Sequence, residues 1–345
     1  MFTTSLGIVT ELRDRRSLTP TGTMTSSKSE ARISPLKVLL GQSSMAMVRH
    51  GGTVKVPMAE RQSQSSHQPW FIISLSTKLR PDHFIVLKTT GTSTIKNLHI
   101  QNWPVHCFEI TSASGTTITG LTLDNSAGNA PNSASDGLPA AHNTDGFDVS
   151  GSTNILITNT TVFNQDDCVA VTSGSNITVS NIVCDGSHGL SIGSVGGKSD
   201  NDVSDVLFTN SIVRNSQNGA RIKTNSGTTG SVSNIEWSNI QVSNISTYGI
   251  DIQQDYLNGG PTGIILFGCI LIVDWFLLGT PTNGVTITGI TMSNITGTVQ
   301  SAAQNYYILC GSGSCSDFDF TNIAITGGTD DSCNYTPTEG NFECA

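Results

Sequence analysis

One short pattern recurs along most of this chain, and it restricts the fold more than any other feature. A run of alternating β-branched residues is followed by Asn or Gly and then by a second such run. Copies that start at Ile155, Ile177, Val206 and Ile235 follow one another at steps of 22, 29 and 29 residues. A period of roughly 20 to 50 residues indicates a solenoid. The alternation of Val, Ile and Thr predicts strands, which would pair in parallel from coil to coil.

The predicted fold is therefore an all-β, single-domain, right-handed parallel β-helix over residues 79–345. A β-sandwich of hairpins is the alternative, but the repeat boundaries lack the tight Asn-Gly or Asp-Gly turns that hairpins prefer. Asn at the corners of a β-helix tolerates left-handed backbone and can stack in ladders. Side chains fill the interior of such a fold, so a site must lie on an outer face, built from equivalent positions on successive coils.

The composition limits the partners. The chain has a formal net charge of −9 and only 12% charged residues, whereas a nucleic-acid partner would require a basic surface. The apolar run 264–278 is too short for the roughly 20 residues that cross a bilayer, so no membrane partner is expected. We expect a monomer that needs no cofactor and no metal.

The eight cysteines suggest disulfides. Short loops closed near a C-terminus are typical of secreted proteins, and Asn-X-Ser/Thr sequons at five positions favour the same interpretation over reduced thiols. We therefore predict a secreted glycoprotein, although "MFTTSLGIVTELRDRRSLTP" does not resemble a signal peptide. Cys107 and Cys269 have no evident partner. The expected pairs are Cys168 with Cys184, Cys310 with Cys315, and Cys333 with Cys344.

Polar residues interrupt the repeats on consecutive coils. Asp145, Asp166 and His188 are separated by 21 and 22 residues, so they would stack as a column on one face. In "FNQDDCVAV", Asp167 has the parity of two buried valines, so the chain must bend for both acids to reach that face. Asp124 and Asp148 lie nearby and are taken as structural. The candidate site residues are Asn143, Asp145, Asp166, Asp167, His188, Arg221, Lys223 and Tyr248.

This combination of residue types suits glycoside hydrolysis. One carboxylic acid must protonate the leaving oxygen, while a carboxylate activates water or attacks the sugar. Crowded carboxylates raise one another's pKa, which keeps one acid protonated. Arg221 and Lys223 share a strand parity and could clamp a sugar carboxylate, so the predicted partner is an acidic polysaccharide.

The order of the motifs "HNTDG", "NQDDC", "SHGLSIGS" and "ARIK" resembles that of the fungal polygalacturonases, which hydrolyse pectin. The resemblance covers roughly residues 80–258 and 281–345, and it favours endo-acting members. It implies an inverting mechanism, with Asp166 as the general acid, Asp145 and Asp167 as the carboxylates that activate water, and His188 supporting the acid. It also implies that Asn143, Arg221, Lys223 and Tyr248 contact the substrate.

Other interpretations stay open. An exo-acting or rhamnogalacturonan-type hydrolase would share the fold, and a calcium-dependent pectate lyase would share both fold and substrate. A non-catalytic glycan-binding β-helix, or an inactive product of a faulty gene model, belongs to a different class. Each residue alone has an ordinary structural explanation, such as a solvated turn for the two acids; only the spacing by coils favours a joint site.

Two segments depart from the pattern. Residues 1–78 show no repeat, and we interpret them as a mis-joined or disordered segment. Residues 264–279 are an apolar insert between two coils, which we interpret as a retained short intron.

Overall fold

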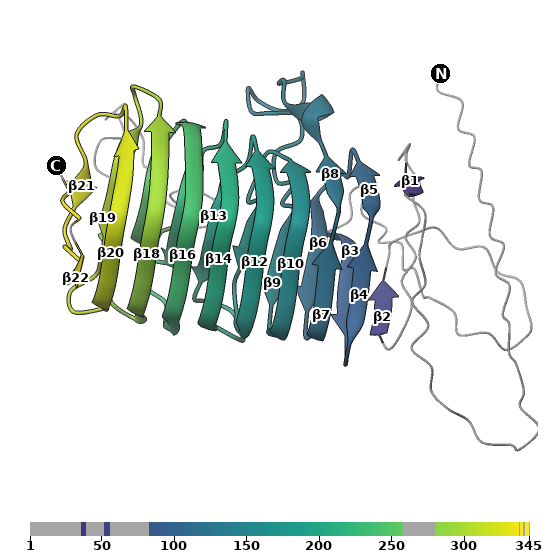
Figure 1. Cartoon of the computed structure of the whole chain (residues 1–345), viewed down its shortest axis with the longest axis horizontal. Helices are drawn as coiled ribbons and strands as arrows, with labels where there is room; N and C mark the ends of the chain where they lie inside the picture. The colour runs from purple at the N-terminus through teal and green to yellow at the C-terminus, as the bar shows by residue number, and fades with distance from the viewer. Residues whose placement is uncertain are drawn as a thin grey trace, which may run out of the picture.

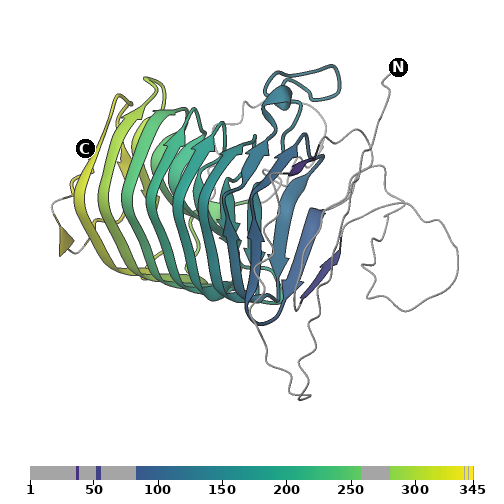
Figure 2. The same cartoon turned by 45° about the vertical axis from the view of Figure 1, so that its right-hand side comes forward.

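The described part of the protein is a stack of parallel coils. The computed structural model describes residues 83–257 and 280–344, except 338 and 341, together with the backbone of the strands β1 (Leu36–Val38) and β2 (Gly52–Lys55). The coils progress in one direction from β3 to β22 (Figure 1), and the second view shows them wrapped around a common interior (Figure 2). The predicted right-handed parallel β-helix is confirmed.

One sheet holds the long strands. It begins with short strands that continue into strands of 12 to 16 residues from β10 to β20. After β1, its members are β4 (Ser93–Lys96), β5 (Leu98–Gln101), β7 (Ser114–Thr119), β8 (Thr122–Asp124), β10 (Ser152–Phe163), β12 (Gly174–Asp185), β14 (Asp202–Arg214), β16 (Gly230–Ile245), β18 (Val285–Val299), β20 (Cys315–Thr326) and β22 (Glu339–Gly340).

The other sheet holds the shorter strands. The 3-10 turn of the described residues, η1 (Ser126–Gly128), precedes β9 of this sheet. Among the described residues, no helix is long and apolar enough to cross a membrane. After β2, the members of this sheet are β3 (His83–Thr89), β6 (His106–Thr111), β9 (Phe147–Ser150), β11 (Val169–Val171), β13 (Leu190–Val195), β15 (Asn218–Asn225), β17 (Tyr248–Tyr256), β19 (Gln304–Leu309) and β21 (Ser332–Cys333).

The core consists of like residues stacked on successive coils. Because alternate side chains of a strand point to opposite faces, each inward position repeats in register along the sheet. Phe208 and Trp237 stack in this way at 5.2 Å between ring centroids. One such row is Ile155, Ile177, Val206, Ile235, Ile290 and Phe318.

The corners use asparagine, as predicted. Many Asn residues at the bends have φ between 50° and 57°, a left-handed conformation that Asn tolerates better than most residues. Their side chains form ladders: the Nδ2 of Asn239 donates to Asn210 at 3.1 Å, and that of Asn294 donates to Asn239 at 3.1 Å. These bonds satisfy side-chain amides at positions where the chain turns.

One repeat boundary differs from the sequence analysis. By its sequence pattern, the next copy after Ile235 would start at Val285, but Val285 pairs with Gly230, and Ile290 pairs with Ile235. The step from β16 to β18 is therefore 55 residues, and that from Ile290 to Phe318 is 28. The reason is that β16 and β18 begin with an extra alternating segment before the shared motif, and periodicity alone could not distinguish the two registers.

The three predicted disulfides are present: Cys168–Cys184, Cys310–Cys315 and Cys333–Cys344. Cys107 is a buried thiol, and burial raises its pKa well above the ordinary value. The insert 264–279, including Cys269, lies outside the described residues, as does segment 1–78 apart from the backbone of β1 and β2.

Candidate active site

The candidate residues meet on the outward face of the short-strand sheet. Residues that alternate with the core form a row across it, in which Ser191 pairs with Arg221 and Arg221 with Asp251. The turns that precede β9 and β11 bring Asp145 and Asp166 to the same face. The structure thus assembles acids and cations that the sequence predicted to share one face of the solenoid.

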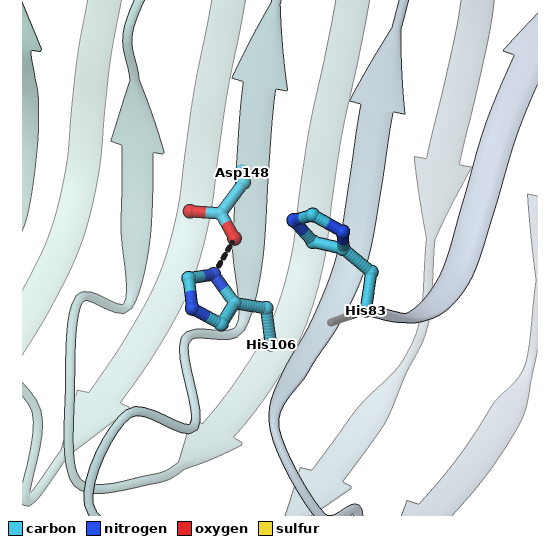
Figure 3. A group of neighbouring side chains, drawn as sticks. All are labelled: His83, His106 and Asp148. Carbon is cyan, nitrogen blue, oxygen red and sulfur yellow. Dashed lines mark hydrogen bonds and ion pairs between the residues drawn. The ribbon is translucent and has the colours of Figure 1, made fainter. Parts of the chain in front are cut away.

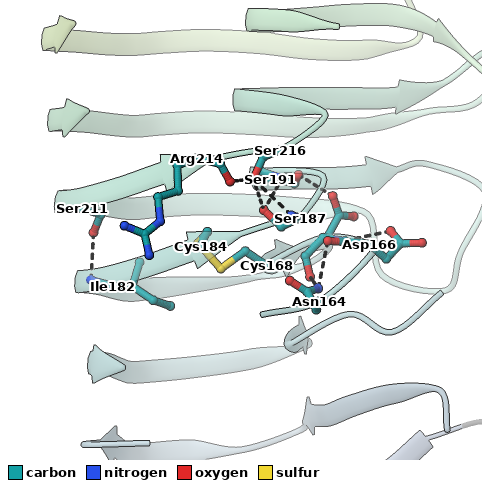
Figure 4. The surroundings of a disulfide bond; sticks show 12 residues. Asn164, Asp166, Cys168, Ile182, Cys184, Ser187, Ser191, Ser211, Arg214 and Ser216 are labelled. Atoms are coloured by element: carbon teal, nitrogen blue, oxygen red, sulfur yellow. Dashed lines mark hydrogen bonds between the residues drawn. A yellow bond between two sulfur atoms is a disulfide. The ribbon is translucent and has the colours of Figure 1, made fainter. Parts of the chain in front are cut away.

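A tight bend between β10 and β11 presents the two adjacent acids. The buried Nδ2 of Asn164 donates to the carbonyls of Thr144, Asp166 and Asp167 at 3.0, 2.9 and 3.0 Å. The Cys168 disulfide ties the end of the bend to the next coil (Figure 4). The predicted bend before Cys168 is confirmed, and it frees both carboxylates from the parity of a straight strand.

Asp167 is buried, but it faces charged groups and not the valine core. Its carboxylate accepts a hydrogen bond from Ser191 Oγ at 2.7 Å and pairs with Lys223 Nζ at 2.5 Å. Arg221 Nη1 lies 4.0 Å from the same carboxylate. These donors compensate the Asp167 carboxylate for the hydration that it loses on burial.

Asp166 lies next to the imidazole predicted to support it. Its Oδ1 is 3.1 Å from His188 Nδ1, and its Oδ2 accepts a hydrogen bond from Asn143 Nδ2 at 3.1 Å. Burial alone would raise the pKa of Asp166. However, the hydrogen bond and charge of His188, with the charge of Lys223 and the backbone N–H of Asp167, lower it far below the ordinary value.

Asp145 has the opposite electrostatic environment. It is 6% exposed, and its Oδ1 has no hydrogen-bond partner among the described residues. Burial raises the pKa of Asp145 well above the ordinary value, and the charges of Asp148, Asp166 and Asp167 raise it further. The crowding of carboxylates predicted from the sequence therefore contributes to a raised pKa at Asp145, whereas the pKa of Asp166 is lowered.

The two predicted cations are almost fully buried side by side. Arg221 Nε donates to Asp251 Oδ2 at 2.9 Å, and both Arg221 and Lys223 lie 5.4 Å from the centre of the Tyr256 ring. Burial raises the pKa of Asp251 to about 7, although Arg221 acts in the opposite direction. The desolvated cations lie where they can pair with an incoming anion.

The aromatic ring next to the two cations belongs to Tyr256, and not to the predicted substrate contact Tyr248. Tyr248 is half-buried and stacks on Tyr307 with 4.5 Å between ring centroids. Tyr256, eight residues later at the end of β17, is the ring that both cations approach. Tyr256 was not predicted from the sequence, because a bulge shifts the register of β15 and β17 just before it.

Other missed residues differ in whether the sequence contained a signal. Ser191 and Asp251 each alternate with core residues of a strand, so counting by two would have placed them on this face. Asn164 offered no such signal, because it resembles any corner asparagine.

One group of ligands in the site could contact a metal ion. Atoms of Asp166, Asp167 and His188 lie within 4.8 Å of one another. The ammonium of Lys223, however, is 2.5 Å from Asp167 and supplies positive charge there. This arrangement disfavours a second cation at that carboxylate, and therefore the calcium chemistry of a lyase.

Comparison with known sequences gives a consistent set of relatives. The profile "Glycosyl hydrolases family 28" matches residues 73–343. The chain is 61% identical over 258 residues to a polygalacturonase of Fusarium fujikuroi, covering 74% of this chain and 65% of that protein. It is 59% identical over 256 residues to a probable endopolygalacturonase D of Emericella nidulans, covering 74% of this chain and 46% of that protein. The chain thus spans about half to two thirds of the length of these relatives.

Two solved structures share the fold. An endopolygalacturonase I from Stereum purpureum, complexed with two galacturonate molecules, is 30% identical with a TM-score of 0.59, covering 73% of this chain and 68% of that one. An endo-xylogalacturonan hydrolase from Aspergillus tubingensis is 29% identical with a TM-score of 0.57, covering 74% and 66%.

Proposed function

Since the chain belongs to glycosyl hydrolases family 28, we propose that it is an endo-polygalacturonase, which hydrolyses the α-1,4-galacturonosidic bonds of pectin and polygalacturonate. The observation that carries the proposal is the site itself: three carboxylates and two buried cations share one face of the helix. Carboxylates supply the acid and base of glycoside hydrolysis, and the cations match a sugar that bears a carboxylate.

Arg221 and Lys223 bind the carboxylate of a galacturonate unit in this proposal. Both are desolvated, and the planar guanidinium of Arg221 is already oriented by Asp251 at 2.9 Å. A pre-oriented fork loses less side-chain freedom when it binds an anion. Asn143 and Tyr248 are proposed to contact neighbouring parts of the chain, and Tyr256 supports the two cations.

Asp166 acts as the general acid, and it must be protonated to do so. In the free protein its pKa is held low, partly by the charge of Lys223. A galacturonate carboxylate that pairs with Lys223 would offset this charge and bring a negative charge close to Asp166. Both effects raise the pKa of Asp166, so substrate binding itself would favour the protonated acid.

His188 supports this change of state. A protonated imidazole 3.1 Å away favours ionised Asp166, whereas a neutral imidazole can accept the proton of the carboxylic acid as a hydrogen bond. Loss of the proton from His188 would therefore assist the acid form of Asp166.

Asp145 and Asp167 activate the water that attacks the anomeric carbon. Water then adds its oxygen to that carbon, its proton passes to a carboxylate, and Asp166 protonates the departing glycosidic oxygen. Asp145 must be ionised to accept the proton. The negative charge of Asp166 raises the pKa of Asp145. When Asp166 takes up a proton this charge is lost, so Asp145 can release its own proton more easily. We expect inversion of the anomeric configuration.

We further propose that the protein acts outside the cell as a monomer. Three disulfides support an oxidising compartment.

The test is an assay of the purified chain, and of a version without residues 264–279, on polygalacturonate. We expect new reducing ends, a fall in viscosity that precedes most of the release of ends, and no unsaturated ultraviolet-absorbing product. Release of galacturonate monomer alone would show exo action, and a calcium-dependent unsaturated product would show a lyase. Hydrolysis only of rhamnose-containing or xylose-substituted pectin would assign a different substrate. Binding without turnover by both versions would show a glycan-binding protein.

A further inference from the structure

A second cluster of chemistry-bearing side chains lies on the same outer face, towards the N-terminal coils. His83, His106 and Asp148 project from β3, β6 and β9, three successive strands of the short-strand sheet. Figure 3 shows the two imidazole rings turned towards the Asp148 carboxylate. The function proposed above gives this cluster no role.

We propose that His83, His106 and Asp148 bind one transition-metal ion of the Zn²⁺ type. One ligand atom from each residue lies within 4.8 Å of the other two. Tetrahedral Zn²⁺ with ligands at about 2.1 Å requires separations of about 3.4 Å, so rotation of the imidazoles would be enough to close the site. Water would occupy the remaining position.

The strands fix the positions of the three residues. His83 and His106 are direct partners in the ladder, and their rings are 5.2 Å apart. His106 Nδ1 and Asp148 Oδ2 already form a hydrogen bond at 2.5 Å, and a metal ion bound to both atoms would displace the proton between them.

Glu109 provides a carboxylate partner for His83, one of the two proposed histidine ligands. Its Oε2 lies 3.4 Å from His83 Nε2, and Ser150 Oγ donates to its Oε1 at 2.7 Å. Such oriented carboxylates next to ligating histidines strengthen metal binding. The histidine side chains are 33% and 32% exposed, so an ion can reach them from solvent.

The ligand types select the metal. Two imidazoles and one carboxylate suit Zn²⁺, Co²⁺ or Cu²⁺, whereas Ca²⁺ and Mg²⁺ prefer oxygen ligands alone. The ion would lie next to the acids of the proposed mechanism, because His106 Nδ1 is 3.7 Å from Asp145 Oδ1. Metal binding itself does not depend on the proposed function.

The experiment is titration of the chelator-treated protein with Co²⁺ and with Zn²⁺ at about pH 7.5, where the ligands can release their protons. Calorimetry gives the stoichiometry, and the visible spectrum of Co²⁺ gives the coordination. Polygalacturonate is left out because it binds divalent cations itself. We expect one ion per chain and a loss of affinity of at least about tenfold in His83→Gln and in His106→Gln.

His188→Gln serves as the matched control, because it removes a ligand from the other cluster. We expect it to bind Co²⁺ like the unmodified protein. Equal binding by the double variant His83→Gln/His106→Gln, or loss of binding in His188→Gln alone, would overturn the proposal. Absence of binding by the folded, unmodified protein at millimolar metal would overturn it too, and would leave a hydrogen-bonded His–Asp pair only.

Discussion

The two sheets of this β-helix carry ion pairs of opposite character. On the long-strand sheet, Arg214 Nε contacts Asp185 at 2.8 Å, and the arginine side chain is 45% exposed. On the short-strand sheet, Lys223 contacts Asp167 at 2.5 Å, and the two side chains are 8% and 2% exposed. The first pair joins neighbouring coils and the second spans two coils, from the turn before β11 to β15, but only the second removes its charges from water.

The difference separates stability from function. An exposed pair contributes little, and a buried pair costs much of its attraction in lost hydration. The charges of the short-strand sheet are therefore poor candidates for stabilising elements of the fold. Their arrangement is better explained by the ligand that they would meet.

The largest expected effect concerns turnover. Asp166→Asn removes the proposed general acid and should lower kcat by roughly 100- to 10,000-fold, the usual contribution of such a group. The matched control is Asp185→Asn on the long-strand sheet, which should leave kcat unchanged. Reducing-end assays and circular dichroism would measure both variants; equal kcat in the two would refute the assignment of Asp166.

The next effect concerns stability. Lys223→Gln removes the cation nearest to the buried charge of Asp167 and should lower the free energy of unfolding by about 3 to 5 kcal/mol. Arg214→Gln breaks the exposed pair and should cost less than about 1 kcal/mol. Urea unfolding of both variants measures the two losses of unfolding free energy. Similar losses in Lys223→Gln and Arg214→Gln would contradict the prediction.

A smaller effect should depend on pH. Burial raises the pKa of Asp251 from 3.8 to about 7, so the folded protein retains a proton that the unfolded chain releases. This contribution to stability is complete below about pH 4 and is lost as the pH rises towards 7. In Asp251→Asn, which cannot titrate, the unfolding free energy should decline less over that range. A steeper decline than in the unmodified protein would contradict the prediction.

The smallest effect concerns the corners. Asn239→Ala places alanine at a φ of 54°, a conformation that Asn tolerates better, and it removes the ladder bonds to Asn210 and Asn294. Left-handed strain of about 1 to 2 kcal/mol should appear as a lower unfolding free energy. Asn239→Gly relieves the strain but does not restore the lost bonds. Its unfolding free energy should therefore lie between that of the unmodified protein and that of Asn239→Ala. Activity should be unchanged in both variants.

Much of the fold could be predicted from periodicity, because strand alternation and coil length are properties of the sequence itself. The shared face of Asp145, Asp166 and His188 followed from spacing in the same way. The register of β18 did not follow from spacing, because the runs that start at Val285 and at Ile290 are similar and either could pair with the run at Ile235. Length alone cannot decide between them.

The opposite pKa shifts of Asp145 and Asp166 could not be predicted from the sequence for a different reason. Asp145 and Asp166 are chemically identical, and only burial and hydrogen-bond partners separate their pKa values. The position of Tyr256 next to the two cations likewise depends on a bulge in the register. Such features arise from three-dimensional contacts, for which spacing is only a partial guide.

The asparagine ladders have a consequence for the sugar coat of the protein. Asn176, Asn244 and Asn294 belong to sequons, yet each donates its Nδ2 to the asparagine of a neighbouring coil. An N-glycan is attached through that same nitrogen, and it would have to fit between coils about 4.8 Å apart. A glycosylated Nδ2 keeps a single hydrogen, so at these three positions a glycan and the ladder bond can coexist only where that hydrogen points to the neighbouring coil and the sugar points to solvent.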